Sequence, residues 1–134
     1  MPEKDSRKER VNSGHRRLYL VRHGESEWNG QRRIQGNSAS NALSETGRKQ
    51  AALLGAEFEK LEFSSVYCSD VERAVETARI ALGEEVKIEF VKELREISFG
   101  SWEGKLIEEI KEESPGMIEE WFEAPSNVLI DGGE

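Results

Sequence analysis

The stretch LYLVRHG, residues 18–24, decides the predicted fold. Residues 18–21 form a short apolar run that favours β-structure, and the polar residues after it end the run. We therefore expect a buried strand over Leu18 to Val21 that gives way to a loop. His23 would lie at the carboxyl end of this strand, and Gly24 would let the backbone come close to it.

The pattern along the rest of the chain predicts alternating helices and strands. A polar loop rich in glycine and asparagine should run from Gly24 to Asn41, and apolar residues at helical spacing follow from Ser44. Ser69 to Glu72 have the Ser-x-x-Glu form of a capping box, which predicts a helix start. The expected strands cover residues 64–68 and 86–90, the second of them half-buried, and the expected helices cover about 44–61, 69–82, 106–112 and 116–122.

This order of elements predicts an α/β fold of three layers (α/β/α), in which helices pack on the faces of a mostly parallel sheet. Ligands of such sheets bind beyond the carboxyl ends of the strands. His23 follows the first expected strand, Arg73 lies in the first helical turn after the second, and Glu96 follows the third. We expect these three side chains, distant in sequence, to meet at one edge of the sheet.

Length and charge limit the possible classes of protein. The chain has 134 residues and a net charge of −8, which fits one soluble domain. Residues 1–17 hold six basic and three acidic residues, and the remainder holds 13 basic and 24 acidic ones. Because an acidic body repels nucleic-acid phosphates, we expect no nucleic-acid partner, and we expect the basic tail over residues 1–17 to be disordered.

Two further absences point to a protein of the cytoplasm. No apolar stretch of the sequence reaches membrane-spanning length, so we expect no membrane partner. The single cysteine, Cys68, rules out an internal disulfide and fits a reducing compartment. With two histidines and one cysteine, a metal site built from several such ligands is also excluded, and we expect no metal and no cofactor.

The three convergent residues, together with Arg22, suit phosphoryl transfer. This chemistry needs a nucleophile, fixed positive charge around the phosphate oxygens and a proton for the leaving oxygen. His23 can attack through one ring nitrogen if the other donates its hydrogen to a carbonyl. Arg22 and Arg73 offer planar forks that match two phosphate oxygens. Glu96 can protonate the leaving oxygen if burial or the phosphate's charge keeps the carboxyl protonated.

Four blocks of the sequence resemble, in order, the motifs of the histidine phosphatase superfamily, which includes the phosphoglycerate mutases. They are RHGESEWN (22–29), QG with LSETG (35–36 and 43–47), SDVERAVETA (69–78) and LREISFGSWEG (94–104). The resemblance covers the chain from Leu18 to its last residue. It indicates a phosphoglycerate mutase-like histidine phosphatase domain over residues 18–134.

The resemblance also implies roles for individual residues. By it, His23 accepts the phosphoryl group, Arg22 and Arg73 bind phosphate, and Glu96 is the acid and base. The other residues that would line the substrate site are Ser26, Asn29, Gln35 and Gly36. The implied partner is a small phosphorylated metabolite.

The sequence departs from the family pattern at one catalytic position. The family carries a second catalytic histidine, on a later strand that lies between the first two, and no histidine follows His23 here. The chain stops at Asp131-Gly132-Gly133-Glu134, which resembles the Gly-Gly-Glu-Ser that opens the family's next helix. We therefore expect a domain truncated at its C-terminus, marginally folded and poorly active.

Three functions remain open at this point. The block from Phe99 to Gly104 resembles the small phosphomonoesterases more than the glycolytic mutases, so we favour a phosphatase that works through a phosphohistidine. One alternative is a phosphotransferase of the phosphoglycerate mutase type. The other is a catalytically impaired fragment or a phosphate-binding scaffold, which the missing second histidine supports.

Overall fold

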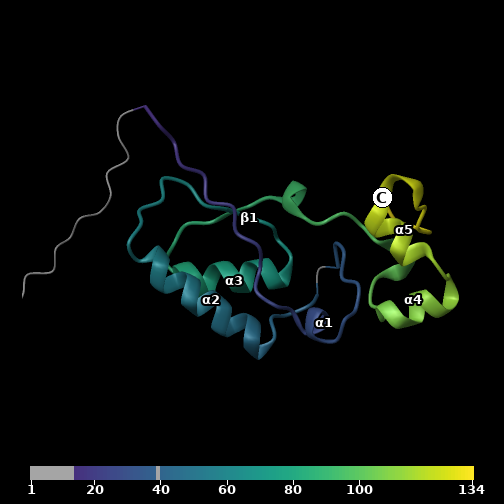
Figure 1. The fold of residues 1–134 in the computed structure, drawn as a ribbon. Coiled ribbons are helices and arrows are strands. Elements are labelled where there is room, and N and C mark those ends of the chain that lie inside the picture. The colour runs from purple at the N-terminus through teal and green to yellow at the C-terminus, as the bar shows by residue number, and fades with distance from the viewer. Residues whose placement is uncertain (1–13, 39) are drawn as a thin grey trace, which may run out of the picture.

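The computed structural model describes residues 14–38 and 40–134, and a parallel βαβ unit lies at its centre (Figure 1). Strand β1 (Tyr67–Cys68) pairs in parallel with β2 (Glu89–Phe90), with Tyr67 opposite Glu89 and Cys68 opposite Phe90. Helix α3 (Glu72–Leu82) connects the two strands and packs beside α2 (Glu45–Phe58). The predicted strand, helix and parallel strand are thus confirmed.

A second group of short helices follows at the other end of the molecule (Figure 1). It comprises the 3-10 helix η2 (Gly100–Trp102), α4 (Ile107–Glu113), α5 (Met117–Glu123) and the 3-10 helix η3 (Pro125–Asn127). The 3-10 helix η1 (Lys92–Leu94) lies on the segment that joins the two groups. Both predicted helices of this region are confirmed within one residue at either end.

The loop predicted over residues 24–41 contains one helical turn, α1 (Glu27–Gly30). Ser26 caps it, because its hydroxyl accepts the Asn29 backbone N–H while the Asn29 side chain accepts the N–H of Ser26. Ser44 caps α2 in a similar way by accepting from the Gly47 N–H at 3.1 Å. The predicted start of α2 at Ser44 is therefore confirmed, although α2 ends at Phe58 and does not reach Leu61.

The predicted capping box at Ser69 is wrong. Helix α3 begins at Glu72 with Val71 as its N-cap residue, two positions later than the box requires, and no side chain caps it. The Ser69 hydroxyl is buried and has no hydrogen-bond partner among the described residues. The chain bends at Asp70 and Val71 after β1 and enters the helix only at Glu72.

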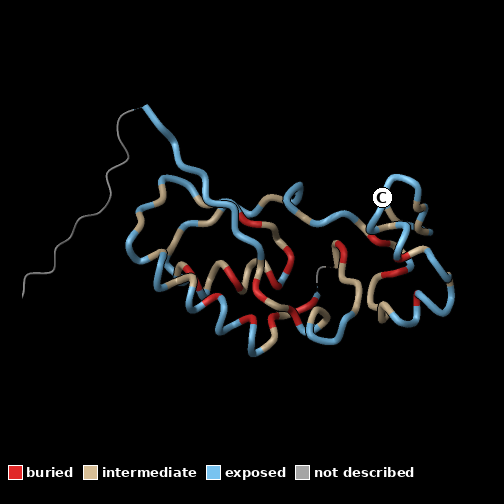
Figure 2. Tube along the Cα trace, viewed as in Figure 1, coloured by how far each residue is buried: buried red, intermediate tan, exposed pale blue. Residues whose placement is uncertain are grey.

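The predicted buried strand over Leu18 to Val21 is also wrong. The segment is extended but pairs with no strand of the described chain, and Leu18 and Leu20 are 82% and 87% exposed. Without a neighbour, its backbone cannot form a ladder and its apolar side chains stay outside (Figure 2). Tyr19 packs edge-on against the rings of Phe58 and Phe63.

The two predicted strands that do form are shorter than expected. Residues 64–66 and 86–88 lie outside the ladder, which holds two residues on each side. Cys68 is buried, as a strand residue above α3 should be, but Tyr67 and Phe90 are 57% and 45% exposed. The half-buried alternation expected for residues 86–90 therefore holds only for Val86 and Ile88, which are partly buried.

Buried residues fall into two groups (Figure 2). One lies between α2, α3 and the loop before α2, and includes Leu43, Ala51, Val71 and Ala81. The other lies in the second group of helices, where the buried residues are Phe99, Trp102, Ile110 and Ile118. The last four residues of the chain contact this second group through backbone bonds between residues 98–101 and 131–134.

Most of the predicted disordered tail, residues 1–17, lies outside the described residues. Residues 14–17 are described, exposed and without helix or strand. Within residues 14–38 and 40–134, every helix is too short or too polar to cross a bilayer.

The close approach of α2 to the loop after His23 predicts a sharp stability effect at Gly47. A Cβ there would overlap the backbone carbonyl of Glu25, whereas a Cβ at Gly30 would have no atom nearer than 3.5 Å. We expect Gly47→Ala to destabilise the fold by about 1–3 kcal/mol, because overpacking outweighs the roughly 1 kcal/mol of gained helix propensity. Chemical denaturation measures the difference, and equal midpoints for Gly47→Ala and Gly30→Ala would contradict this packing.

Candidate active site

His23 lies just beyond the extended segment, half-buried, with each ring nitrogen facing a different partner. Its Nδ1 is 2.7 Å from the Gly24 carbonyl oxygen, and its Nε2 is 3.4 Å from Nε of Arg73. A carbonyl can only accept a hydrogen bond and a guanidinium can only donate one. The hydrogen of the neutral ring must therefore sit on Nδ1, and Nε2 carries the lone pair, which accepts the long contact from Arg73.

Arg73 is the most deeply buried charge of the site, with 2% of its surface exposed. Its Nη1 donates to the Ser38 carbonyl at 2.8 Å and its Nη2 donates to the Gly36 carbonyl at 2.6 Å. Burial lowers the pKa of the guanidinium, while the charges of Glu96 and Glu103 raise it. Arg73 stays charged, and it holds the loop around Gly36 against α3 while its Nε faces His23.

The environment of His23 favours its neutral form. Burial lowers the pKa of the imidazole below its ordinary value of 6.5, and the charges of Arg73 and Arg22 lower it further. The hydrogen bond to the Gly24 carbonyl and the charge of Glu96 act in the opposite direction. The net effect is a ring that is unprotonated, and so nucleophilic, at neutral pH.

Arg22 and Glu96 approach the site from the solvent side, because both are exposed. Their charges act on His23, and Glu96 also acts on Arg73, so the predicted convergence of His23, Arg73 and Glu96 is present in the structure. The Glu96 carboxylate accepts the N–H of Ile97 at 3.1 Å. It makes no hydrogen bond to His23 in the described structure.

The chain before Glu96 is fixed to the start of α3. Arg95 donates from Nε and Nη2 to the two carboxylate oxygens of Asp70, at 2.5 and 2.7 Å. This paired hydrogen bond lowers the pKa of Asp70. Because Asp70 lies three residues before Arg73, the ion pair keeps the Glu96 segment next to the helix that carries Arg73.

The predicted substrate residues divide into two kinds. Asn29, Gln35 and Gly36 line a cleft of about 1240 Å³ that also contains His23, Arg22, Arg73 and Glu96. Ser26 is fully buried, and its hydroxyl donates to Gln35 Oε1 at 2.6 Å. Ser26 thus holds the loop that presents Gln35, and it does not itself reach the cleft.

Sequence analysis missed the residues that hold this loop in place. Asn41 is 5% exposed and donates from its amide to both Ser26 Oγ and Gln35 Oε1. Glu103 Oε1 accepts the N–H groups of Asn37 and Phe99, at 3.2 and 3.0 Å. Both residues stand in or beside the quoted motifs, but only their contacts reveal what they do.

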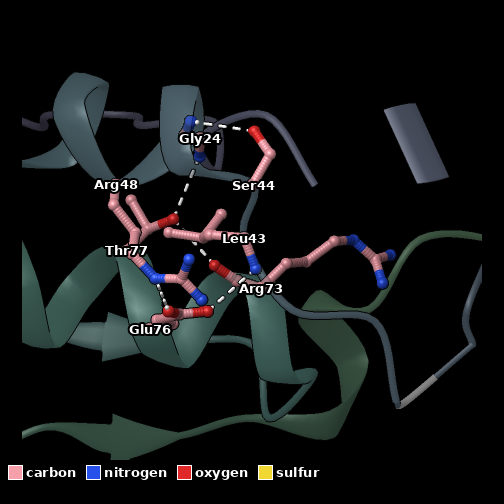
Figure 3. Close-up of polar contacts among 8 residues, drawn as sticks. Gly24, Leu43, Ser44, Arg48, Arg73, Glu76 and Thr77 are labelled. Carbon is pink, nitrogen blue, oxygen red and sulfur yellow. Dashed lines mark hydrogen bonds and ion pairs between the residues drawn. The ribbon is translucent and has the colours of Figure 1, made fainter. Parts of the chain in front are cut away.

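Besides Arg73, two side chains of helix α3 contact other segments of the site (Figure 3). Glu76 accepts the N–H of Leu43 at 2.8 Å and pairs with Arg48 Nε at 2.7 Å. Thr77 accepts the N–H of Gly24 at 3.0 Å and donates to the carbonyl of Arg73 at 2.7 Å. The spacing could have pointed to Thr77, because positions four apart on a helix share a face and Thr77 follows Arg73 by four.

Known proteins are similar to this chain in sequence and in structure. Phosphoserine phosphatase 1 of Hydrogenobacter thermophilus is 42% identical over 120 residues, which are 88% of this chain and 56% of that protein. The probable phosphoglycerate mutase GpmB of Salmonella choleraesuis is 38% identical over 120 residues, 87% of this chain and 54% of that protein. The chain therefore spans about half the length of the curated relatives it matches.

A solved structure confirms the predicted fold class. Bacillus stearothermophilus YhfR matches with a TM-score of 0.77 and 40% sequence identity, over 84% of this chain and 56% of that one. The sequence profile of the histidine phosphatase superfamily (branch 1) matches residues 18–134, the same range as the domain expected from the sequence. This chain belongs to the histidine phosphatase superfamily.

Proposed function

We propose that this chain carries the phosphoryl-accepting part of a phosphatase site, with His23 as the nucleophile. The observation that carries the proposal is the state of the His23 ring. Its Nδ1 faces the Gly24 carbonyl at 2.7 Å, and its unprotonated Nε2 faces a buried, permanently charged guanidinium at 3.4 Å. A neutral nucleophile next to fixed positive charge is the arrangement that phosphoryl transfer requires.

The reaction would proceed in two displacements. In the first, Nε2 of His23 forms a bond to phosphorus as the bond to the leaving oxygen breaks, and Glu96 gives its proton to that oxygen. The Gly24 carbonyl stabilises the positive charge of the phosphorylated ring through Nδ1–H. In the second, water attacks the phosphorus, Glu96 takes the water proton, and the nitrogen–phosphorus bond breaks. Arg22 and Arg73 stabilise the charge on the phosphoryl oxygens.

The substrate we propose is a small phosphorylated metabolite, bound in the cleft that Asn29, Gln35 and Gly36 line. The phosphoserine phosphatase among the relatives supports a phosphatase of this kind. We also propose a cytoplasmic location, because the buried free thiol of Cys68 fits a reducing compartment.

A mutase-type phosphotransferase is the second candidate, and the similarity to a probable phosphoglycerate mutase favours it. The two functions differ in the acceptor of the second displacement, which is water in one and a substrate hydroxyl in the other. Product analysis with 3-phosphoglycerate separates them, since a mutase returns an isomer and a phosphatase returns inorganic phosphate. A scaffold that only binds phosphate would return neither product.

Incubation with a radioactive phosphoryl donor should label the chain on His23. We expect a label that is lost in acid and kept in alkali, that is absent from His23→Ala, and that forms equally well with a chelator present, since Arg22 and Arg73 supply the charge. His15→Ala, which removes the other histidine, is the matched control and should label normally. Acid-stable label on a hydroxyl, or no label at all, would contradict the proposal.

The lowered pKa of His23 predicts how the label depends on pH. The imidazole should titrate below 6.5, so the labelling rate should hold as pH falls through 6.5 and decline only at lower pH. Arg22→Gln should raise the midpoint of the His23 titration, because it removes a cation that disfavours the protonated ring. Added salt should reduce the difference in midpoint between Arg22→Gln and the wild type, since Arg22 is exposed. Ring titration by NMR measures the midpoint. Lys49→Gln removes an equal charge from the exposed side of α2 and should leave the midpoint unchanged.

The acid role of Glu96 predicts a dependence on the leaving group. Glu96→Gln should slow labelling from alkyl phosphates by about 10²–10⁴-fold, because an alkoxide needs a proton to leave. Labelling from aryl phosphates should fall much less. Equal losses for the two classes of donor would mean that Glu96 is not the acid, and Glu93→Gln, an exposed neighbour on the same segment, should change neither rate.

A further inference from the structure

A buried hydroxyl joins the two segments that carry His23 and Arg73. Thr77 is 5% exposed and lies on α3 one turn after Arg73. Its Oγ1 accepts the backbone N–H of Gly24 at 3.0 Å and donates its hydrogen to the carbonyl of Arg73 at 2.7 Å (Figure 3). A hydroxyl has one hydrogen to give and lone pairs to accept with, so one atom satisfies both contacts.

The residue that Thr77 holds is the one that orients the imidazole. The carbonyl of Gly24 faces His23 Nδ1, and its N–H reaches Thr77. The next N–H along the chain, that of Glu25, donates to the side chain of Gln50 at 2.9 Å. Both peptide groups that flank Gly24 are therefore fixed, although a glycine would otherwise allow many backbone conformations.

The backbone of Gly24 is closely packed. A Cβ built on Gly24 would lie 2.6 Å from the carbonyl oxygen of Gly47 at the start of α2. The Gly24 backbone is thus enclosed between α2 on one side and Thr77 on the other. Removal of the hydroxyl would leave a buried N–H unsatisfied, and the backbone could regain a partner only by moving.

We propose that Thr77 is a positioning residue of the site. Through Gly24 it fixes the orientation of the His23 ring relative to the guanidinium of Arg73. Arg73 lies one turn before Thr77 on the same helix. The inference rests on the proposed function only in taking His23 as the phosphoryl acceptor. Gln50 is exposed and its contact is open to water, so the buried hydroxyl is the stronger of the two constraints.

The first test reads the His23 ring directly by nitrogen NMR and needs no activity. Wild type and Thr77→Ser should show one tautomer with the hydrogen on Nδ1. Thr77→Val keeps the shape of the side chain but removes the hydroxyl, and it should show a mixture of tautomers. Ala81→Gly, which weakens the same helix one turn further on, controls for loss of stability and should keep the wild-type tautomer.

The second test is the rate of label formation on His23. We expect Thr77→Val to lower the maximal rate by about 10–100-fold with little change in the donor concentration at half-maximal rate, since misplacement affects the attack more than binding. Thr77→Ser should recover most of the rate. A single tautomer and a normal rate in Thr77→Val would overturn the proposal, and so would an equal loss in Ala81→Gly.

A third measurement keeps the proposal open to refutation if Thr77→Val does not fold. In the wild type and in Thr77→Ser, the Gly24 amide hydrogen should exchange slowly with solvent, because it is bonded and buried. Fast exchange at Gly24 in these folded proteins would overturn the proposal. If the wild type forms no label while the tautomer results hold, the proposed function fails and the positioning role of Thr77 stands.

Discussion

The site depends on the burial of one guanidinium. A charge that is 2% exposed, as Arg73 is, must find hydrogen-bond acceptors inside the protein, because an unpaired buried charge is costly. The loop that contains Gly36 and Ser38 supplies them, because it turns two backbone carbonyls toward the guanidinium. The same charge then faces Nε2 of His23 and adds to burial, the larger cause, in lowering the pKa of the imidazole.

The loop over Arg73 also connects the two groups of helices. Glu103 Oε1 accepts the N–H groups of Asn37 and Phe99, and backbone bonds join Ile34 to Gly104 and Lys105. At Gly36, φ is +51° and a Cβ would clash with the Glu103 carboxylate, so a side chain there would separate the two groups. The segment that carries Glu96 runs between them, so these contacts also set its distance from His23.

Motif and periodicity together could predict the helices, the parallel βαβ unit and the meeting of His23, Arg73 and Glu96. They failed where the local signal depends on a tertiary neighbour. Leu18 to Val21 have the composition of a buried strand, but in the described chain they have no strand to pair with and stay exposed. Asn41 gave no signal of its own, because a polar side chain beside a motif reveals its partner only once the backbone is folded. The spacing of Thr77 from Arg73 indicated only that the two share a face of the helix.

The charges around His23 also explain why a phosphate would complete this site. The charges of Arg73 and Arg22 both disfavour a protonated His23 ring. The negative charge of Glu96 acts on both His23 and Arg73, and that of Glu103 acts on Arg73. A phosphate dianion beside Nε2 would replace the long 3.4 Å contact between Arg73 and the imidazole with shorter, charge-assisted bonds to its oxygens.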